Sequence, residues 1–169
     1  DKLWGEEGVR VTVSDIYMQC NPRISRRGES YIIVWDSTYP GDEYTYERDI
    51  KAQKIVGGSR LWGDEGIVIA WQKGPQVDHF LIGVIDGEYI LWKRGDGANA
   101  AIYLKRIDDE GNAFDGWDAY GLLVCDYPGY VQRGYKYLMT EEGLLVLWED
   151  QRTEEGDPIN ASIYGQLIS

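Results

Sequence analysis

The sequence repeats itself three times at an interval of about 56 residues, which constrains the fold more than any other feature. Tryptophans end three apolar runs, 57 and 56 residues apart, at Trp35, Trp92 and Trp148. Two further markers recur in the same order. They are a Trp-Gly motif (Leu3–Gly8, Leu61–Gly66 and, more loosely, Phe114–Gly121) and an isoleucine-containing segment (Asp49–Ile55, Ala101–Ile107 and Ser162–Ile168). We therefore expect a single repeat domain over residues 1–169, with repeat boundaries near 1–57, 58–112 and 113–169.

The middle repeat predicts short strands separated by tight turns. It contains four runs rich in β-branched and aromatic residues: Ile67–Trp71, Val77–Ile85, Glu88–Trp92 and Ala101–Ile107. The dipeptide Asp86-Gly87 between two of them is a strong hairpin signal. Such spacing is typical of antiparallel all-β structure. We expect each repeat to form a four-stranded antiparallel blade, as in a propeller.

Composition and charge exclude several partners. The chain has 29 acidic and 17 basic residues, a formal net charge of −12. Such a surface repels a nucleic-acid backbone and an anionic membrane face. No segment approaches the roughly 20 apolar residues of a membrane span, so we expect no membrane insertion. Two cysteines, Cys20 and Cys125, leave open whether one disulfide or two free thiols are present.

Residues suited to catalysis are scarce. His79 is the only histidine, and we interpret it as a solvated or hydrogen-bonded strand residue. Acidic residues recur next to the Trp-Gly motif, where they belong to the repeated turn. The segment Asp108–Asn112 is rich in oxygen ligands but lacks the spacing of a calcium loop, so we interpret it as an acidic turn. We therefore predict that the protein is not an enzyme and uses no metal or cofactor.

The aromatic residues fall into a repeated and a non-repeated group. The three repeated tryptophans are expected to fill the core between sheets. The non-repeated tyrosines in or near loops are the candidates for contact with a ligand such as a glycan, or with another protein. They are Tyr39, Tyr44, Tyr46, Tyr127 and Tyr130.

The two ends of the chain carry complementary parts of one repeat junction. Between repeats, the isoleucine-containing strand precedes the Trp-Gly motif, yet the last such strand ends at Ile168 and the first motif has none before it. Terminal strands of this kind can pair within one molecule or between molecules. The expected interface residues are Leu3, Trp4, Val9 and Val11 at one end, and Ile163, Tyr164, Leu167 and Ile168 at the other.

The third repeat resembles the repeats of bacterial secreted β-propeller proteins. It reads Trp148-Glu149-Asp150-Gln151-Arg152 and then Ile163–Ile168, close to the pattern Trp-Glu-Asp-x-Arg followed by Ile-Tyr-x-Gln-x-Ile. The first two repeats depart from this pattern at Trp35-Asp36-Ser37 and Trp92-Lys93-Arg94. The resemblance implies propeller blades, an extracellular or cell-surface location, and a repeat that acts as scaffold rather than as active site.

Three blades are too few for a propeller, which closes with about four to eight. We therefore expect a ring of two chains, a filament, or a piece of a longer protein. A closed threefold β-trefoil or β-prism is the alternative fold. The predicted function is self-assembly or scaffolding with further copies of this chain as the partner, and the alternative is a glycan-binding, lectin-like module.

Overall fold

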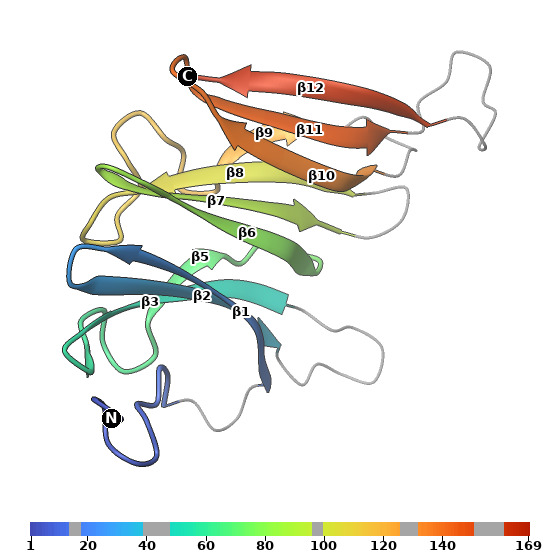
Figure 1. Ribbon diagram of the computed structural model, residues 1–169. Helices are drawn as coiled ribbons and strands as arrows, with labels where there is room; N and C mark the ends of the chain where they lie inside the picture. The colour runs from blue at the N-terminus through green and yellow to red at the C-terminus, as the bar shows by residue number, and fades with distance from the viewer. Residues whose placement is uncertain (14–17, 39–47, 96–99, 126–131, 151–160) are drawn as a thin grey trace, which may run out of the picture.

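The computed structural model describes residues 1–13, 18–38, 48–95, 100–125, 132–150 and 161–169. In this part of the chain every regular element is a β-strand, and the strands form three antiparallel sheets stacked face to face (Figure 1). No described segment forms a helix long and apolar enough to cross a membrane. The prediction of an all-β, blade-like architecture is confirmed.

Sheet A has five strands, sheet B four and sheet C three. Sheet A contains β1 (Met18–Arg27), β2 (Ser30–Thr38), β3 (Arg48–Val56), β4 (Ser59–Arg60) and β5 (Ile67–Ala70). Sheet B contains β6 (Gln76–Val84), β7 (Gly87–Arg94), β8 (Ala101–Ile107) and β9 (Leu122–Cys125). Sheet C contains β10 (Gln132–Met139), β11 (Leu144–Asp150) and β12 (Ser162–Ile168). β5 pairs with β3, as β9 pairs with β8.

The three sheets form an open stack. Sheets A and C lie at opposite ends with sheet B between them, and the two chain ends lie at these opposite ends (Figure 1). A closed β-trefoil or β-prism would place the first and third repeats face to face. That alternative is wrong, because sheet C presents no face to sheet A.

The first strand of each sheet carries a β-bulge at the same repeat position. The pairing shifts register next to Asn21 in β1, Asp78 in β6 and Gly134 in β10. Their φ angles are 53°, 55° and 61°, in the left-handed region that residues other than glycine rarely adopt. A bulge of this kind bends the strand and redirects its side chains. The repeat period is therefore visible in the backbone.

The three repeated tryptophans are buried in the core, as predicted. Trp92 Nε1 donates to Gln76 Oε1 at 2.8 Å, and its ring stacks on Tyr103 with a centroid separation of 5.6 Å. Trp35 makes the equivalent hydrogen bond to Gln19. These bonds satisfy the indole N–H groups, which would otherwise be costly to bury.

Two hydrophobic clusters join the sheets, one between sheets A and B and one between sheets B and C. Alternate residues of a strand point to opposite faces, so each sheet uses one face for each neighbour. The faces that sheets A and B present to the following sheet are fully buried: Val34, Ile50 and Ala52 in sheet A, and Leu91, Ile102 and Leu104 in sheet B.

Residues 1–13 lie against the outer side of sheet A, at the end of the stack opposite to sheet C (Figure 1). Trp4 packs edge-on against Tyr31, with ring centroids 5.6 Å apart. Val11 packs against the small cluster on this side of sheet A. Arg60 donates to the Arg10 carbonyl at 2.8 Å. Sheets B and C each pack on the preceding sheet through one face. The N-terminal segment covers the corresponding face of sheet A.

The two cysteines are not bridged. Cys20 is partly exposed in sheet A, whereas Cys125 is buried in sheet B. The alternative of two separate thiols, which the sequence left open, is the one observed.

Candidate functional site

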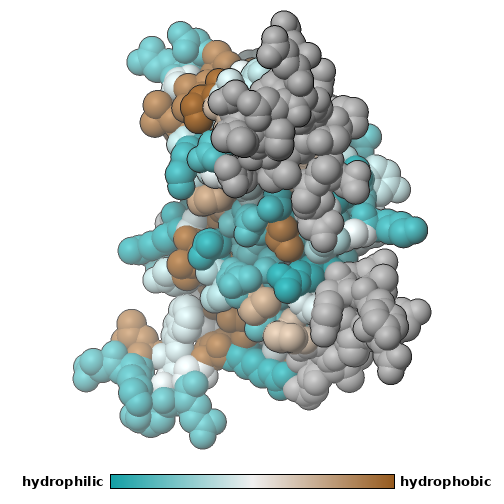
Figure 2. Space-filling view, turned by 90° about the vertical axis from the view of Figure 1, so that its right-hand side faces the viewer, coloured by the Kyte–Doolittle hydropathy of each residue, from teal (hydrophilic) through white to brown (hydrophobic). Residues whose placement is uncertain are grey.

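The face of sheet C that points away from sheet B is largely apolar, and no described element covers it. Leu138, Leu147 and Ile163 are exposed on it, together with Leu167. Leu145 lies opposite both Leu138 and Leu167, so these three residues share one face of the sheet. Leu147 and Ile163 lie two and four residues along the strands from Leu145 and Leu167, so they share it too. Hydrophobic side chains gather at the upper end of the molecule in Figure 2, which is the end formed by sheet C in Figure 1. We call this surface the outward face.

The same repeat positions are buried in the other two sheets. Ile163 is 69% exposed, whereas Ile50 and Ile102, which lead their strands in the same way, are 0% exposed. Leu147 is 39% exposed, and its equivalents Val34 and Leu91 are likewise 0% exposed. The outward face is therefore apolar in the same way as the equivalent faces of sheets A and B, each of which is covered by the next sheet of the chain.

Sheet C also lacks the fourth strand of the other sheets. β3 pairs with β5 and β8 pairs with β9, but among the described residues β12 pairs only with β11. An edge strand of this kind, with no further described strand beside it, presents backbone N–H and C=O groups to which another strand can pair.

The glycine that ends each Trp-Gly motif allows the strand after it to approach the neighbouring strand closely. Gly66 has a φ of +73°, and a Cβ there would lie 2.2 Å from the Ala52 carbonyl oxygen and 3.0 Å from Trp35. Gly121 is similar, with a φ of +85° and Trp92 at 2.7 Å. Gly8 has a φ of +76°, but no described atom lies within 4 Å of its Cβ position. Gly8 thus has the backbone conformation of Gly66 and Gly121, while no described residue approaches it as closely.

The predicted interface residues lie at opposite ends of the stack. Ile163 and Leu167 are on the outward face. Tyr164 instead stacks on Trp148 with a centroid separation of 6.3 Å, and Ile168 is buried in the cluster between sheets B and C. These two residues therefore build the core of sheet C rather than its open face.

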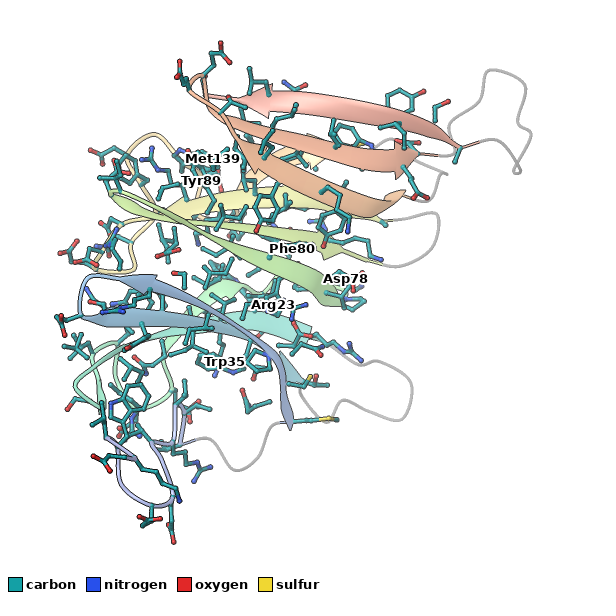
Figure 3. All side chains as sticks on the ribbon, in the orientation of Figure 1. Arg23, Trp35, Asp78, Phe80, Tyr89 and Met139 are labelled. Carbon is teal, nitrogen blue, oxygen red and sulfur yellow. The ribbon has the colours of Figure 1, made fainter. Side chains whose placement is uncertain are left out.

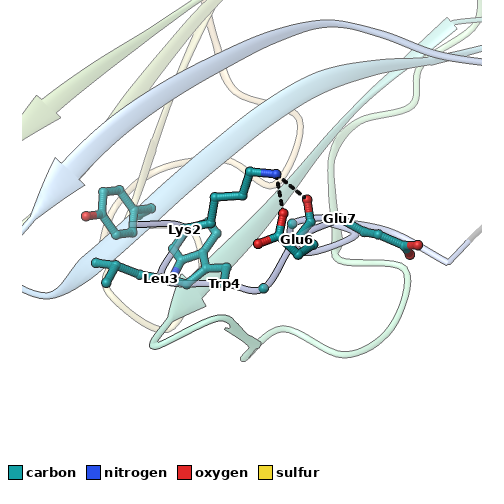
Figure 4. A pocket seen from close by; sticks show the side chains of 8 residues that line it. Lys2, Leu3, Trp4, Glu6 and Glu7 are labelled. Carbon is teal, nitrogen blue, oxygen red and sulfur yellow. Dashed lines mark hydrogen bonds and ion pairs between the residues drawn. The ribbon is translucent and has the colours of Figure 1, made fainter.

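Leu3 and Trp4 of the predicted interface line a surface hollow. Lys2–Gly8 and Tyr31 enclose a volume of about 390 Å³, where Lys2 Nζ lies 2.6 Å from Glu6 Oε2 (Figure 4). Leu3 is exposed, Trp4 packs on Tyr31, and Val9 lies 3.4 Å from the position that a Cβ on Gly58 would take. The sequence allowed the two ends to pair within one molecule or between molecules, and in the single chain they lie at opposite ends of the stack.

A second hollow lies where the first strands of the three sheets meet. It has a volume of about 230 Å³, and its lining includes Arg23 and the neighbouring Asp78 and Phe80 (Figure 3). Asp78 Oδ2 lies 3.0 Å from Lys93 Nζ. Tyr135 donates its hydroxyl to the Asp78 carbonyl, and burial raises the pKa of this phenol. We call this site the axial hollow.

His79 joins sheets A and B next to the axial hollow. It is fully buried, and its Nδ1 lies 2.8 Å from Asp36 Oδ1. Asn21 Nδ2 donates to the other Asp36 oxygen at 2.7 Å. The sequence predicted a solvated or hydrogen-bonded histidine; the solvated alternative is wrong, because His79 is buried, and the contact with Asp36 was missed. The only available signal was a difference between repeats: the residue after the repeated tryptophan is Asp36 in the first repeat and Lys93 in the second.

The acidic turn uses its carboxylates within the fold. Asp108 Oδ1 accepts from the backbone N–H groups of Glu110 and Asn112 at 3.0 and 2.8 Å. Asp109 pairs with Lys54 at 2.7 Å and with Arg27, so it links sheets A and B. The candidate ligand-contact residues Tyr39, Tyr44, Tyr46, Tyr127 and Tyr130 lie outside the described residues.

Glu88 is a buried carboxylate between sheets A and B. Neither of its oxygens has a hydrogen-bond partner among the described residues. Burial raises its pKa, while the neighbouring Ser25 hydroxyl and, less strongly, the charge of Arg27 act in the opposite direction. The raised pKa means that the folded state holds the proton more tightly than the unfolded chain does.

Replacing Glu88 with glutamine should therefore stabilise the protein at pH 7. The contribution of wild-type Glu88 is fully present below the unfolded pKa of about 4.3 and is lost as the pH rises through the folded pKa. The gain from Glu88→Gln should thus shrink between pH 7 and pH 4.5. Urea unfolding at both pH values measures it, and an equal gain at both would contradict the assignment.

The comparisons with known proteins concern the fold. No protein-family model matches the sequence, and no curated protein matches it either. The crystal structure of an endo-arabinase from Bacteroides thetaiotaomicron VPI-5482 is similar, with a TM-score of 0.50 and 16% sequence identity. The match covers 90% of this chain and 58% of the endo-arabinase chain. The chain is therefore an all-β protein whose stacked antiparallel sheets resemble part of a β-propeller.

Proposed function

We propose that this protein is a non-enzymatic scaffold that assembles head to tail with further copies of itself. In this assembly the outward face of sheet C packs on the outer side of sheet A of the next copy. The observation that carries the proposal is the exposure of Ile163, 69%, at a repeat position that is 0% exposed in both other sheets. The equivalent faces of sheets A and B are buried interfaces, and a large exposed apolar face is typical of an interaction surface.

The free edge of β12 supports the same partner. β5 and β9 each begin directly after the glycine of a Trp-Gly motif, and their first residues pair with Ala52 and Leu104. Val9 directly follows Gly8, and the residue of sheet C equivalent to Ala52 is Gly165. In the proposed assembly Val9 of one copy therefore pairs with Gly165 of another, which adds a strand to an open sheet.

The opposite placement of the two surfaces sets the symmetry. An interface between two different patches of the same chain is heterologous, so it builds a ring when the rotation closes and a filament when it does not. Residues 1–13 cover the outer side of sheet A in the single chain, and they would leave it to pair with the next copy.

The lining of the axial hollow is one observation behind the non-enzymatic part of the proposal. Glycosidases use two carboxylates that flank the bond they cleave. Asp78 is the one carboxylate among the described residues that line the hollow, and it is paired with Lys93. The extracellular or cell-surface location rests on the resemblance of the third repeat to secreted bacterial propeller repeats.

The mutation Ile163→Lys should abolish the assembly without unfolding the chain. It would bury an unpaired ammonium at the interface, so we expect the dissociation constant to rise by about 100-fold or more. Ile85→Lys is the matched control, since Ile85 is 99% exposed in the turn between β6 and β7. Light scattering over a range of protein concentrations measures the mass of each variant.

Two results would count against this proposal. A wild-type mass that stays at the 19.3 kDa of one chain at every concentration would exclude a second copy as the partner. Equal loss of association in Ile163→Lys and Ile85→Lys would show that added charge, rather than the outward face, is responsible.

Glycan binding is the second candidate function, and the axial hollow favours it. The hollow combines aromatic rings with the charged side chains of Arg23 and Lys136, and pockets for sugars use such mixtures. Titration of the protein with neutral and acidic oligosaccharides tests this role. Saturable binding that Arg23→Ala weakens would support it, and no binding to any of them would leave the assembly as the function.

A further inference from the structure

A buried glutamine holds the Trp-Gly turn in sheet A. Gln53 is 0% exposed. Its Nε2 donates to the Gly63 carbonyl at 2.7 Å, and its Oε1 accepts from the Trp62 backbone N–H at 2.8 Å. These two bonds attach the turn before β5 to the third strand of the sheet, which fixes where β5 begins.

A lysine takes this role in sheet B. Lys105 donates to the Ala119 carbonyl at 2.8 Å, within the turn that precedes β9. That turn has a different sequence, Gly116-Trp117-Asp118-Ala119, in which the glycine comes before the tryptophan. Within this chain, glutamine thus accompanies the Trp-Gly order, and lysine accompanies the Gly-Trp order.

Gln166 stands at the same position in sheet C. Gln53 lies opposite Ile33 and Gln166 lies opposite Val146, each two residues before the repeated tryptophan on the neighbouring strand. Unlike Gln53, Gln166 is exposed. Its amide donates to the carbonyl of its neighbour Leu167 at 3.0 Å.

A turn that fits Gln166 already exists at the other end of the chain. Gly5 and Gly8 have φ angles of +82° and +76°, and the equivalent Gly63 and Gly66 have +77° and +73°. Trp4 precedes Gly5 in the order that accompanies glutamine. The turn is therefore preorganised, which lowers the entropic cost of binding.

We propose that Gln166 is the receptor for the Trp4-Gly5 turn of a second copy. Its Oε1 accepts from the Trp4 backbone N–H, and its Nε2 donates to the Gly5 carbonyl. Gly8 of that copy then lies against Trp148 and the Gly165 backbone, as Gly66 lies against Trp35 and Ala52. This inference rests on the proposed function and adds the residue that sets the register of the added strand.

The register gives the interface its specificity. A shift by one residue would turn every side chain of the added strand to the wrong face. With the Trp4-Gly5 turn on Gln166, residues 9–12 occupy the place beside β12 that β5 occupies beside β3. A polar side chain that binds two backbone groups of one turn is suited to select this arrangement over slipped ones.

The test measures the dissociation constant of the full chain by sedimentation equilibrium. Gln166→Ala removes both hydrogen bonds and should weaken association about tenfold or more. Gln166→Glu keeps the acceptor for Trp4 but places a carboxylate oxygen against the Gly5 carbonyl, so it should weaken association at least as much. Ser162→Ala is the control, because Ala101 already stands at that position in sheet B.

The outcomes separate this inference from the function on which it rests. At protein concentrations low enough to keep every variant a single chain, thermal unfolding should be unchanged by the Gln166 mutations, since Gln166 is exposed in the single chain. If the wild type associates and Gln166→Ala associates with the same affinity, the receptor role of Gln166 is overturned and the assembly itself is not. Equal affinity in Gln166→Glu overturns the proposed pair of bonds. A wild type that does not associate overturns both the assembly and the receptor.

Discussion

Replacing Gly66 with alanine is expected to lower the free energy of unfolding by about 3–4 kcal/mol. The new Cβ would lie 2.2 Å from the Ala52 carbonyl oxygen and 3.0 Å from the Trp35 ring, at a φ of +73° that disfavours alanine. The contact is with backbone, so relief requires that β5 move away from β3. Urea unfolding followed by circular dichroism measures the loss.

Gly63→Ala is the matched control for the Gly66 mutation. Gly63 has nearly the same φ, +77°, but nothing lies within 4 Å of its Cβ position. It should therefore lose only the backbone strain, about 1 kcal/mol. Equal losses for the two mutations would mean that the close approach of β5 to sheet A does not matter for stability.

The mutation Trp92→Ala should cost about 3–5 kcal/mol. Trp92 is 1% exposed in the middle of the stack, where it packs between sheets A and B. Its removal leaves a large cavity, takes away the stacking on Tyr103 and leaves Gln76 Oε1 without its donor. Unfolding by urea, followed by circular dichroism because fluorescence would change with the mutation, measures the loss.

Trp71→Ala tests whether this cost comes from burial. Trp71 is 45% exposed and contacts Tyr120 at a ring centroid separation of 5.4 Å. Its loss should cost no more than about 1.5 kcal/mol, since much of the ring is already in water. A Trp92→Ala protein as stable as Trp71→Ala would contradict the placement of Trp92 in the core.

The strands were predictable because their signals are local. The segment Ala101–Ile107 was predicted as a strand and forms β8 with the same ends. Val77–Ile85 was predicted one residue away from the observed β6, and Asp86 lies in the hairpin turn as expected. Alternating burial and glycine turns act over a few residues, so they can be read without knowing the fold.

The partners of individual side chains were not predictable. His79 meets Asp36 across two sheets, 43 positions away along the chain, and the sequence holds no signal for that distance. Gln166 belonged to the repeat pattern of the third repeat but was not among the predicted interface residues. Its role becomes visible only when Gln53 and Lys105 are found to hold equivalent turns.

The sequence by itself determined the repeat, the strands and the aromatic core, because each of these follows from local pattern and from an interval that recurs along the chain. Tertiary structure alone decided that the stack stays open, that residues 1–13 lie on sheet A, and that Ile163 and Leu147 remain uncovered. The reason is physical: equivalent residues carry equal local signals, but their burial depends on whether a further sheet packs on them. Ile50, Ile102 and Ile163 have the same place in the repeat, and only the sheets stacked on the first two distinguish them.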